Sequence, residues 1–197
     1  MLLNSDGSRN EIEYDENGNM LKQEFYDENG ELTGSETYSY EYYEDGSVKK
    51  QTQIYSDGRR YEREYYENGD LKKETNYFAN GDIDTQYEYD ENGDCIKAIH
   101  NIGENTFNVF EYSYEYYENG LIKKHTEYLN GELYRTNAFE YYENGNVKIR
   151  TELSSSSFKE VSEFYENGYL KNYTLYNADG GIILEEKFDE EGSPIEP

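Results

Sequence analysis

The stretch Tyr65-Tyr66-Glu67-Asn68-Gly69-Asp70-Leu71-Lys72 decides the fold of this chain, because close copies of it recur along nearly the whole length. The copies lie at residues 42–49, 116–123, 141–148 and 164–171, and looser variants begin at Tyr14, Tyr89 and Phe188. The glycines that end the phrase follow one another at intervals of 28, 23, 24, 27, 25, 23 and 24 residues. The chain is therefore a repeat protein.

A second series of turn signals lies between the copies. Its members are Gly7, Gly30, Gly58, Gly81, a turn at Gly103 to Asn105, Gly131, residues 154–157 and Gly180. Together the two series place 15 of the 17 glycines in turns about 11 or 12 residues apart. That spacing predicts antiparallel hairpins rather than helices.

The register of each hairpin follows from the pairing of apolar residues. A two-residue loop, Asn68-Gly69, would place Tyr65 opposite Lys72. A three-residue loop that adds Glu67, a type I turn closed by a left-handed glycine, places Tyr65 opposite Leu71. Because opposite residues share a face, we predict the second register. It also pairs Tyr14 with Met20, Tyr42 with Val48, Tyr89 with Cys95, Tyr116 with Ile122, Tyr141 with Val147 and Phe164 with Leu170.

The residues beside these pairs predict a charged, solvated opposite face. Continued without interruption, the register places Glu41 opposite Lys49, Glu64 opposite Lys72, Glu115 opposite Lys123, Glu140 opposite Lys148 and Glu163 opposite Lys171. Such exposed cross-strand pairs contribute about 0.2 to 1 kcal/mol each and mainly fix the register.

These patterns predict an all-β fold, an elongated, twisted, single antiparallel β-meander of about eight hairpin repeats of 23 to 28 residues without helices. We expect one β-repeat domain over residues 1–197, which is compatible with a longer array. The absence of Pro before Pro194 fits an uninterrupted hydrogen-bond ladder.

The composition excludes several classes of function. The formal charge of −26 disfavours binding to nucleic acid or to an anionic membrane surface. Hydrophobic residues make up only 34% of the chain, which is typical of disorder, but 25 tyrosines supply the apolar surface of a thin sheet. The sequence shows no signal peptide or membrane span, and the single Cys95 fits a reducing compartment. These features favour the cytoplasm slightly and leave the compartment open.

Candidate sites for chemistry are weak. The two histidines, His100 and His125, fall on the solvated face, and no nucleophile motif accompanies them, so we expect no enzyme activity and no catalytic residue. The stretch 90–94 begins like a calcium loop, but its glycine falls fourth rather than sixth, and Asn101 stands where glutamate is needed. We predict no metal and no cofactor.

The best candidate is a partner-binding surface of tyrosines interleaved with cations. The register as predicted makes Tyr40 face Lys50, Tyr114 face Lys124 and Arg63 face Lys73, and Tyr61 and Arg135 complete the surface. Cation–π stacking within the sheet explains the same pattern without a ligand, so both interpretations stay open at this point.

The phrases 65–72 and 116–123 resemble MORN-type repeats, specifically the bacterial variant named for the YwqK-family antitoxins. A weaker resemblance, through residues 26–32 and 89–93, is to the YD repeats of Rhs-type proteins. The resemblance implies an antiparallel interaction scaffold, without the regular mid-strand glycine of eukaryotic MORN repeats.

The function expected from this resemblance is a non-enzymatic scaffold for protein–protein interaction, with an antitoxin or immunity role against a basic toxin as its specific version. The alternative is a cell-surface or secreted module that binds glycan or calcium. A third hypothesis is mimicry of nucleic acid by the acidic edge. Partner identity and oligomeric state do not follow from the sequence.

Overall fold

The computed structural model describes residues 2–104 and 106–195 of the chain, which divides into two compact units, residues 1–108 and 109–197. The described residues form strands and turns and no helix, which confirms the all-β prediction. Accordingly, nothing in the described part forms a helix long and apolar enough to cross a membrane. That residues 1–197 form one domain stays a prediction.

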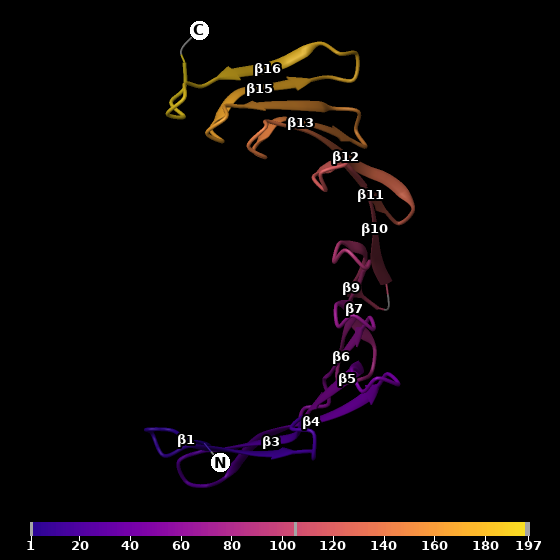
Figure 1. The fold of residues 1–197 in the computed structure, drawn as a ribbon, viewed down its shortest axis with the longest axis vertical. Helices are drawn as coiled ribbons and strands as arrows, with labels where there is room; N and C mark the ends of the chain where they lie inside the picture. Colours follow the sequence, from indigo (N-terminus) through magenta and orange to yellow (C-terminus); the bar gives the residue numbers. More distant parts are fainter. Residues whose placement is uncertain (1, 105, 196–197) are drawn as a thin grey trace. The chain divides into compact units, whose positions relative to one another are not determined.

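The first unit holds β1 (Leu2–Leu3), β2 (Arg9–Tyr14), β3 (Met20–Tyr26), β4 (Leu32–Tyr42), β5 (Val48–Tyr55), β6 (Arg60–Tyr65), β7 (Leu71–Tyr77), β8 (Ile83–Tyr89) and β9 (Cys95–Gly103). The second holds most of β10 (Thr106–Tyr116) with β11 (Ile122–Leu129), β12 (Glu132–Tyr141), β13 (Val147–Ser154), β14 (Lys159–Phe164), β15 (Leu170–Tyr176) and β16 (Ile182–Lys187). Within each unit, strands that follow one another in the chain lie side by side (Figure 1) and pair antiparallel.

The turns have the predicted geometry. Gly69 has φ +91°, its N–H donates to the Tyr66 carbonyl at 3.0 Å, and the Tyr66 N–H donates to the Asp70 carbonyl at 2.8 Å. Tyr65 lies opposite Leu71, so the three-residue loop is confirmed, as are the other predicted apolar pairs. Fifteen glycines have positive φ; of the turn predicted at Gly103 to Asn105, Asn105 lies outside the described residues.

The charged pairs predicted next to these turns are wrong, because each turn is followed by a second β-bulge, in addition to the G1 bulge that its left-handed glycine forms. The register shifts by one residue between Glu64 and Tyr65, so Glu64 lies opposite Lys73, and Lys72 is the extra residue. The observed pairs are Glu41 with Lys50, Glu115 with Lys124, Glu140 with Ile149 and Glu163 with Asn172. From each bulge onward, residues change face relative to the prediction.

In the first unit the bulge aligns charges of alternating sign into a continuous row. From β4 to β9 the row is Glu41, Lys50, Glu64, Lys73, Glu88 and Lys97, each directly opposite the next. Two ammonium groups form ion pairs on this face, Lys50 with Glu62 at 3.0 Å and Lys73 with Glu88 at 3.7 Å. A row of opposite charges opposes slippage of any strand, since a slip of two residues would break the alternation.

The sheet has almost no apolar core. Ala98 is the one buried apolar residue among those described. The other buried residues are polar and lie at strand centres; Thr75 and Thr174 are examples. Long side chains cover them: Arg60 stacks over the Tyr77 ring at 3.9 Å, and the Tyr77 hydroxyl donates to Glu62 at 3.3 Å. Each face is therefore covered by its own long side chains, as expected for a thin sheet.

Candidate partner-binding surface

The structure separates the predicted surface residues onto two faces. In the first unit, Tyr40, Tyr61 and Arg63 lie on one face, which we call the tyrosine face, whereas Lys50 and Lys73 lie on the other, the lysine face. The second unit has the same arrangement, with Tyr114 and Arg135 on its tyrosine face and Lys124 on its lysine face.

The predicted cross-strand pairs between tyrosine or arginine and lysine are therefore wrong. The observed pairs are Tyr40 with Gln51, Arg63 with Glu74 and Tyr114 with His125. The physical reason is the second bulge, which places both lysines of each Lys-Lys pair on the lysine face. That these residues bind a partner stays a prediction.

On the tyrosine face of the first unit, Glu74 is the centre of a hydrogen-bond network that the sequence did not reveal. The hydroxyls of Tyr61 and Tyr89 both donate to its carboxylate, the latter at 3.0 Å, and Arg63 donates to the Tyr61 hydroxyl at 3.0 Å. Burial and the bond to Glu74 raise the pKa of Tyr89. These contacts give the polar groups of Tyr61, Arg63 and Tyr89 hydrogen-bond partners within the sheet.

On the tyrosine face of the second unit, Glu127 has the equivalent role. Its side chain is only 8% exposed, and its carboxylate accepts from Arg135 at 2.7 Å, with His125 Nδ1 at 3.6 Å. The His125 ring stacks on Tyr114, with centroids 4.7 Å apart. The bond to Glu127 raises the pKa of Arg135. The prediction that His125 lies on the solvated face is thus wrong.

His100 is the second histidine for which the predicted face is wrong. It packs against Tyr87 on the tyrosine face of the first unit, with ring centroids 5.6 Å apart. The same bulge accounts for this error, since it reverses the face of residues downstream of the turn.

The second tyrosine of each phrase ties one repeat to the next. Its hydroxyl donates to a backbone carbonyl in the following repeat, at 2.5 to 2.9 Å; the pairs are Tyr43 with Tyr65, Tyr66 with Tyr89, Tyr117 with Phe139, Tyr142 with Phe164 and Tyr165 with Phe188. The first lysine of the phrase lies 5.5 to 6.0 Å from the centroid of the same ring; these are Lys49, Lys72, Lys123, Lys148 and Lys171. We call this tyrosine–lysine–carbonyl unit the inter-repeat staple.

One staple is displaced. In the other staples the carbonyl that accepts the hydrogen bond belongs to the first residue of the next phrase. Tyr117 instead donates to the carbonyl of Phe139, two residues before Tyr141, the first residue of its next phrase. The pairing shows the same offset, because Lys124 lies opposite Ala138 rather than Glu140. The β12–β13 turn therefore extends two residues past its neighbour.

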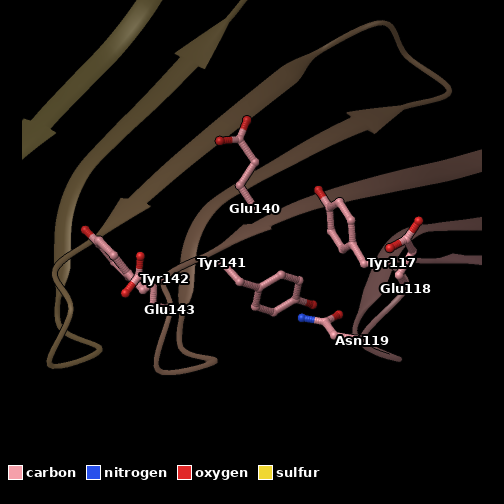
Figure 2. A pocket seen from close by; sticks show the side chains of 7 residues that line it. All are labelled: Tyr117, Glu118, Asn119, Glu140, Tyr141, Tyr142 and Glu143. Carbon is pink, nitrogen blue, oxygen red and sulfur yellow. The ribbon is translucent and has the colours of Figure 1, made fainter.

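A hollow of about 850 Å³ lies between the two turns. Figure 2 shows Tyr117 and Glu118 on one turn and Tyr142 and Glu143 on the other, with the Tyr141 ring between them. The Tyr117 and Tyr141 rings meet edge to face, with centroids 6.2 Å apart. Three hydroxyl bonds fix the rings, Tyr117 and Tyr142 through their staples and Tyr141 to the Ile122 carbonyl at 2.9 Å. The aromatic walls of the hollow are thus held in place.

The hollow is acidic and its lining contains no cation. Glu118, Glu140 and Glu143 line it together with the three tyrosines and Asn119. Within the described residues, none of the three carboxylates forms an ion pair. Glu140 also lines an adjoining hollow of about 190 Å³ together with Ile149, Lys123 and Lys124, and Lys124 is paired there with Glu115 at 3.3 Å. By contrast, a hollow of about 260 Å³ in the first unit is lined by Glu41, Glu64 and two tyrosines, and by Lys49, Lys50 and Lys72.

Among the described residues, no three or more His, Cys, Asp or Glu side chains form a group that could hold a metal ion. Burial raises the pKa of the Cys95 thiol, which makes its thiolate less available.

Comparison with known proteins bears on the repeat. Residues 10–27, 21–40, 61–83 and 137–152 match the family model described as a MORN repeat variant. At these four places the chain carries MORN-variant repeats. MORN repeats are commonly modules that bind proteins or membranes, and the repeat is non-catalytic. The staple gives a physical reason for the constant spacing of tyrosine and lysine in the phrases of this chain, since the two side chains must meet on one face.

No curated protein matches the chain. The crystal structure of TcdB2-TccC3 without its hypervariable C-terminal region aligns over 93% of this chain at 12% sequence identity and a TM-score of 0.32. This chain spans 14% of the length of that chain.

Proposed function

We propose that this protein is a non-enzymatic scaffold of MORN-variant repeats that binds a basic protein partner, and that its specific role is that of an antitoxin or immunity protein. The observation that carries the proposal is the acidic hollow with ordered tyrosine walls, on a chain of net charge −26. Rigid aromatic side chains are the groups that most often anchor a protein interface.

The charge distribution supports a basic partner in particular. The phrase turns carry acidic residues, and the lysines of the repeats are engaged in rows and staples within the sheet. A surface of one sign raises the association rate of an oppositely charged protein and repels acidic competitors.

The test is an affinity purification from the native host with the full chain as bait, at about 150 mM NaCl, where the Debye length is about 8 Å. An acidic protein of similar size and charge serves as control. We expect a basic protein that the full chain retains and the control does not. Failure to retain any protein beyond the control would contradict the scaffold function. If the captured protein is toxic when expressed alone, co-expression with this chain should restore growth.

A further inference from the structure

We propose that the hollow between the β10–β11 and β12–β13 turns is the place where a lysine or arginine side chain of the partner enters. This inference rests on the proposed function and specifies where the basic segment docks. Its starting point is a change along the repeats: in the first unit the equivalent glutamates face lysines, but Glu140 faces Ile149 and Glu163 faces Asn172. Of these two glutamates, Glu140 lies next to the offset pairing of β11 with β12.

The missing lysine has a traceable cause. In three phrases a second lysine follows the first, so that the first lysine closes the staple and the second faces a glutamate on the preceding strand, as Lys72 and Lys73 do. The fourth phrase ends in Lys148-Ile149. Lys148 still lies over Tyr142, at 5.8 Å, but no cation stands opposite Glu140.

The two-residue offset then leaves space where a cation can enter. Carboxylates come from both turns, Glu118 from one and Glu143 from the other, with Glu140 on the adjoining strand. Lys123 and Lys148 already lie over Tyr117 and Tyr142, so Tyr141 is the wall whose ring faces an incoming cation. A cation over an aromatic ring and beside a carboxylate gains from both contacts.

The chemistry of the lining selects the occupant. An anion would meet three exposed carboxylates that form no ion pair, and an apolar side chain would displace water from them without replacing its hydrogen bonds. A cationic side chain with an aliphatic stem matches both the carboxylates and the rings. Charge complementarity therefore favours a basic protein segment over a second copy of this acidic chain.

Hexa-arginine is a suitable probe, because it presents the proposed side chain without requiring the natural partner. Its affinity for the full chain is measured by fluorescence anisotropy at about 150 mM NaCl. The variant is Glu140→Gln/Glu143→Gln, and the control is Glu41→Gln/Glu44→Gln. The control replaces the glutamates at the same two positions of an earlier repeat and changes the net charge by the same amount. In that repeat, however, Lys50 lies opposite Glu41.

We expect the hollow variant to weaken binding about 5- to 10-fold and the control less than about 2-fold, from the loss of two carboxylate contacts. Equal weakening by the two variants would overturn the inference, since the peptide would then respond only to net charge. The inference would also be overturned if the wild-type chain bound calcium, added as calcium chloride, but did not bind hexa-arginine.

A second pair of variants tests the aromatic wall. Tyr141→Phe and Tyr141→Leu both lose the hydroxyl bond to Ile122, but only Phe keeps the ring. We expect Phe to retain affinity within about 2-fold and Leu to lose about 3- to 5-fold, the size of one cation–π contact. Equal affinities of Phe and Leu would overturn the role of the ring. Either outcome is separate from the purification test, which fails only if no protein is retained.

Discussion

Glu64 on β6 lies directly opposite Lys73 on β7, and Lys72 is the bulged residue that stacks with Tyr66. This relationship assigns different roles to two adjacent, chemically identical side chains. One lysine neutralises the charge row and the other closes the inter-repeat staple.

A double-mutant cycle distinguishes these roles. Between Glu64→Ala and Lys73→Ala we expect a coupling free energy of about 0.3 to 1 kcal/mol, typical of a direct cross-strand pair. Between Glu64→Ala and Lys72→Ala it should be near zero. Urea unfolding of the single and double variants measures both. A larger coupling of Glu64 to Lys72 than to Lys73 would contradict the second bulge and would support the register predicted without it.

The turn glycine provides a second prediction. At Gly69 the backbone has φ +91° and a Cβ would meet no atom within 4 Å, so any penalty comes from the backbone alone. We expect Gly69→Val to lower the free energy of unfolding by about 1 to 3 kcal/mol and Glu67→Ala by less than about 0.5 kcal/mol. Gly34→Ala, in a strand and without positive φ, is the control for the loss of a glycine. Equal midpoints for Gly69→Val and Glu67→Ala in urea unfolding would argue against the left-handed turn.

The inter-repeat staple provides a third prediction. Tyr66→Phe keeps the ring beside Lys72 and removes the hydroxyl that donates to the Tyr89 carbonyl at 2.7 Å. We expect a loss of about 0.5 to 1.5 kcal/mol in the free energy of unfolding, the range for one hydrogen bond. The control is Tyr14→Phe, since the Tyr14 side chain is 54% exposed. The staple has no energetic role if the two variants have the same stability.

The pH dependence of the turns follows from Asp45. Hydrogen bonds from the side chain and backbone of Ser47 hold its pKa below the ordinary value of 3.8. A lowered folded-state pKa stabilises the fold above the unfolded value, and this contribution disappears as the pH falls through the folded value. Asp45→Ala should therefore be less stable than wild type at pH 7, and the difference should shrink below about pH 4.

A matched control separates this effect from the general repulsion of a chain with charge −26. Glu44→Ala removes the same charge from the same turn but not the acceptor of the Ser47 bonds. Urea unfolding of both variants across the pH range gives the comparison. A stability difference between them that stays constant down to acid pH would refute the assignment to Asp45.

Much of the fold follows from the sequence, because apolar residues and turn glycines restrict the register. Pairing Tyr65 with Leu71 requires the three-residue loop, and the structure has it. The second bulge does not follow from the same reasoning, because either Lys72 or Lys73 gives Glu64 an opposite charge. The face of every residue downstream depends on that choice, including the faces of both histidines.

The residues that line the hollow were missed for a related reason. Sequence intervals between phrases vary, and extra residues can be absorbed in a return turn or in a bulge without displacing the next turn. A signal was nevertheless present. The first lysine is present at Lys148, but Ile149 stands where the second lysine would be, which indicates that the two positions have different roles.

The central claim is that a missing lysine leaves the hollow open to a partner's cation, and the substitution Ile149→Lys tests it most directly. Ile149 lies opposite Glu140, so a lysine there restores the cation of the earlier repeats. Asn172→Lys adds the same charge opposite Glu163 of the next repeat, a glutamate that does not line the hollow. With circular dichroism confirming that both variants are folded, we predict that Ile149→Lys weakens hexa-arginine binding about 5-fold and Asn172→Lys less than about 2-fold, as expected for one added ion pair at the site. Unchanged affinity in Ile149→Lys would contradict the account.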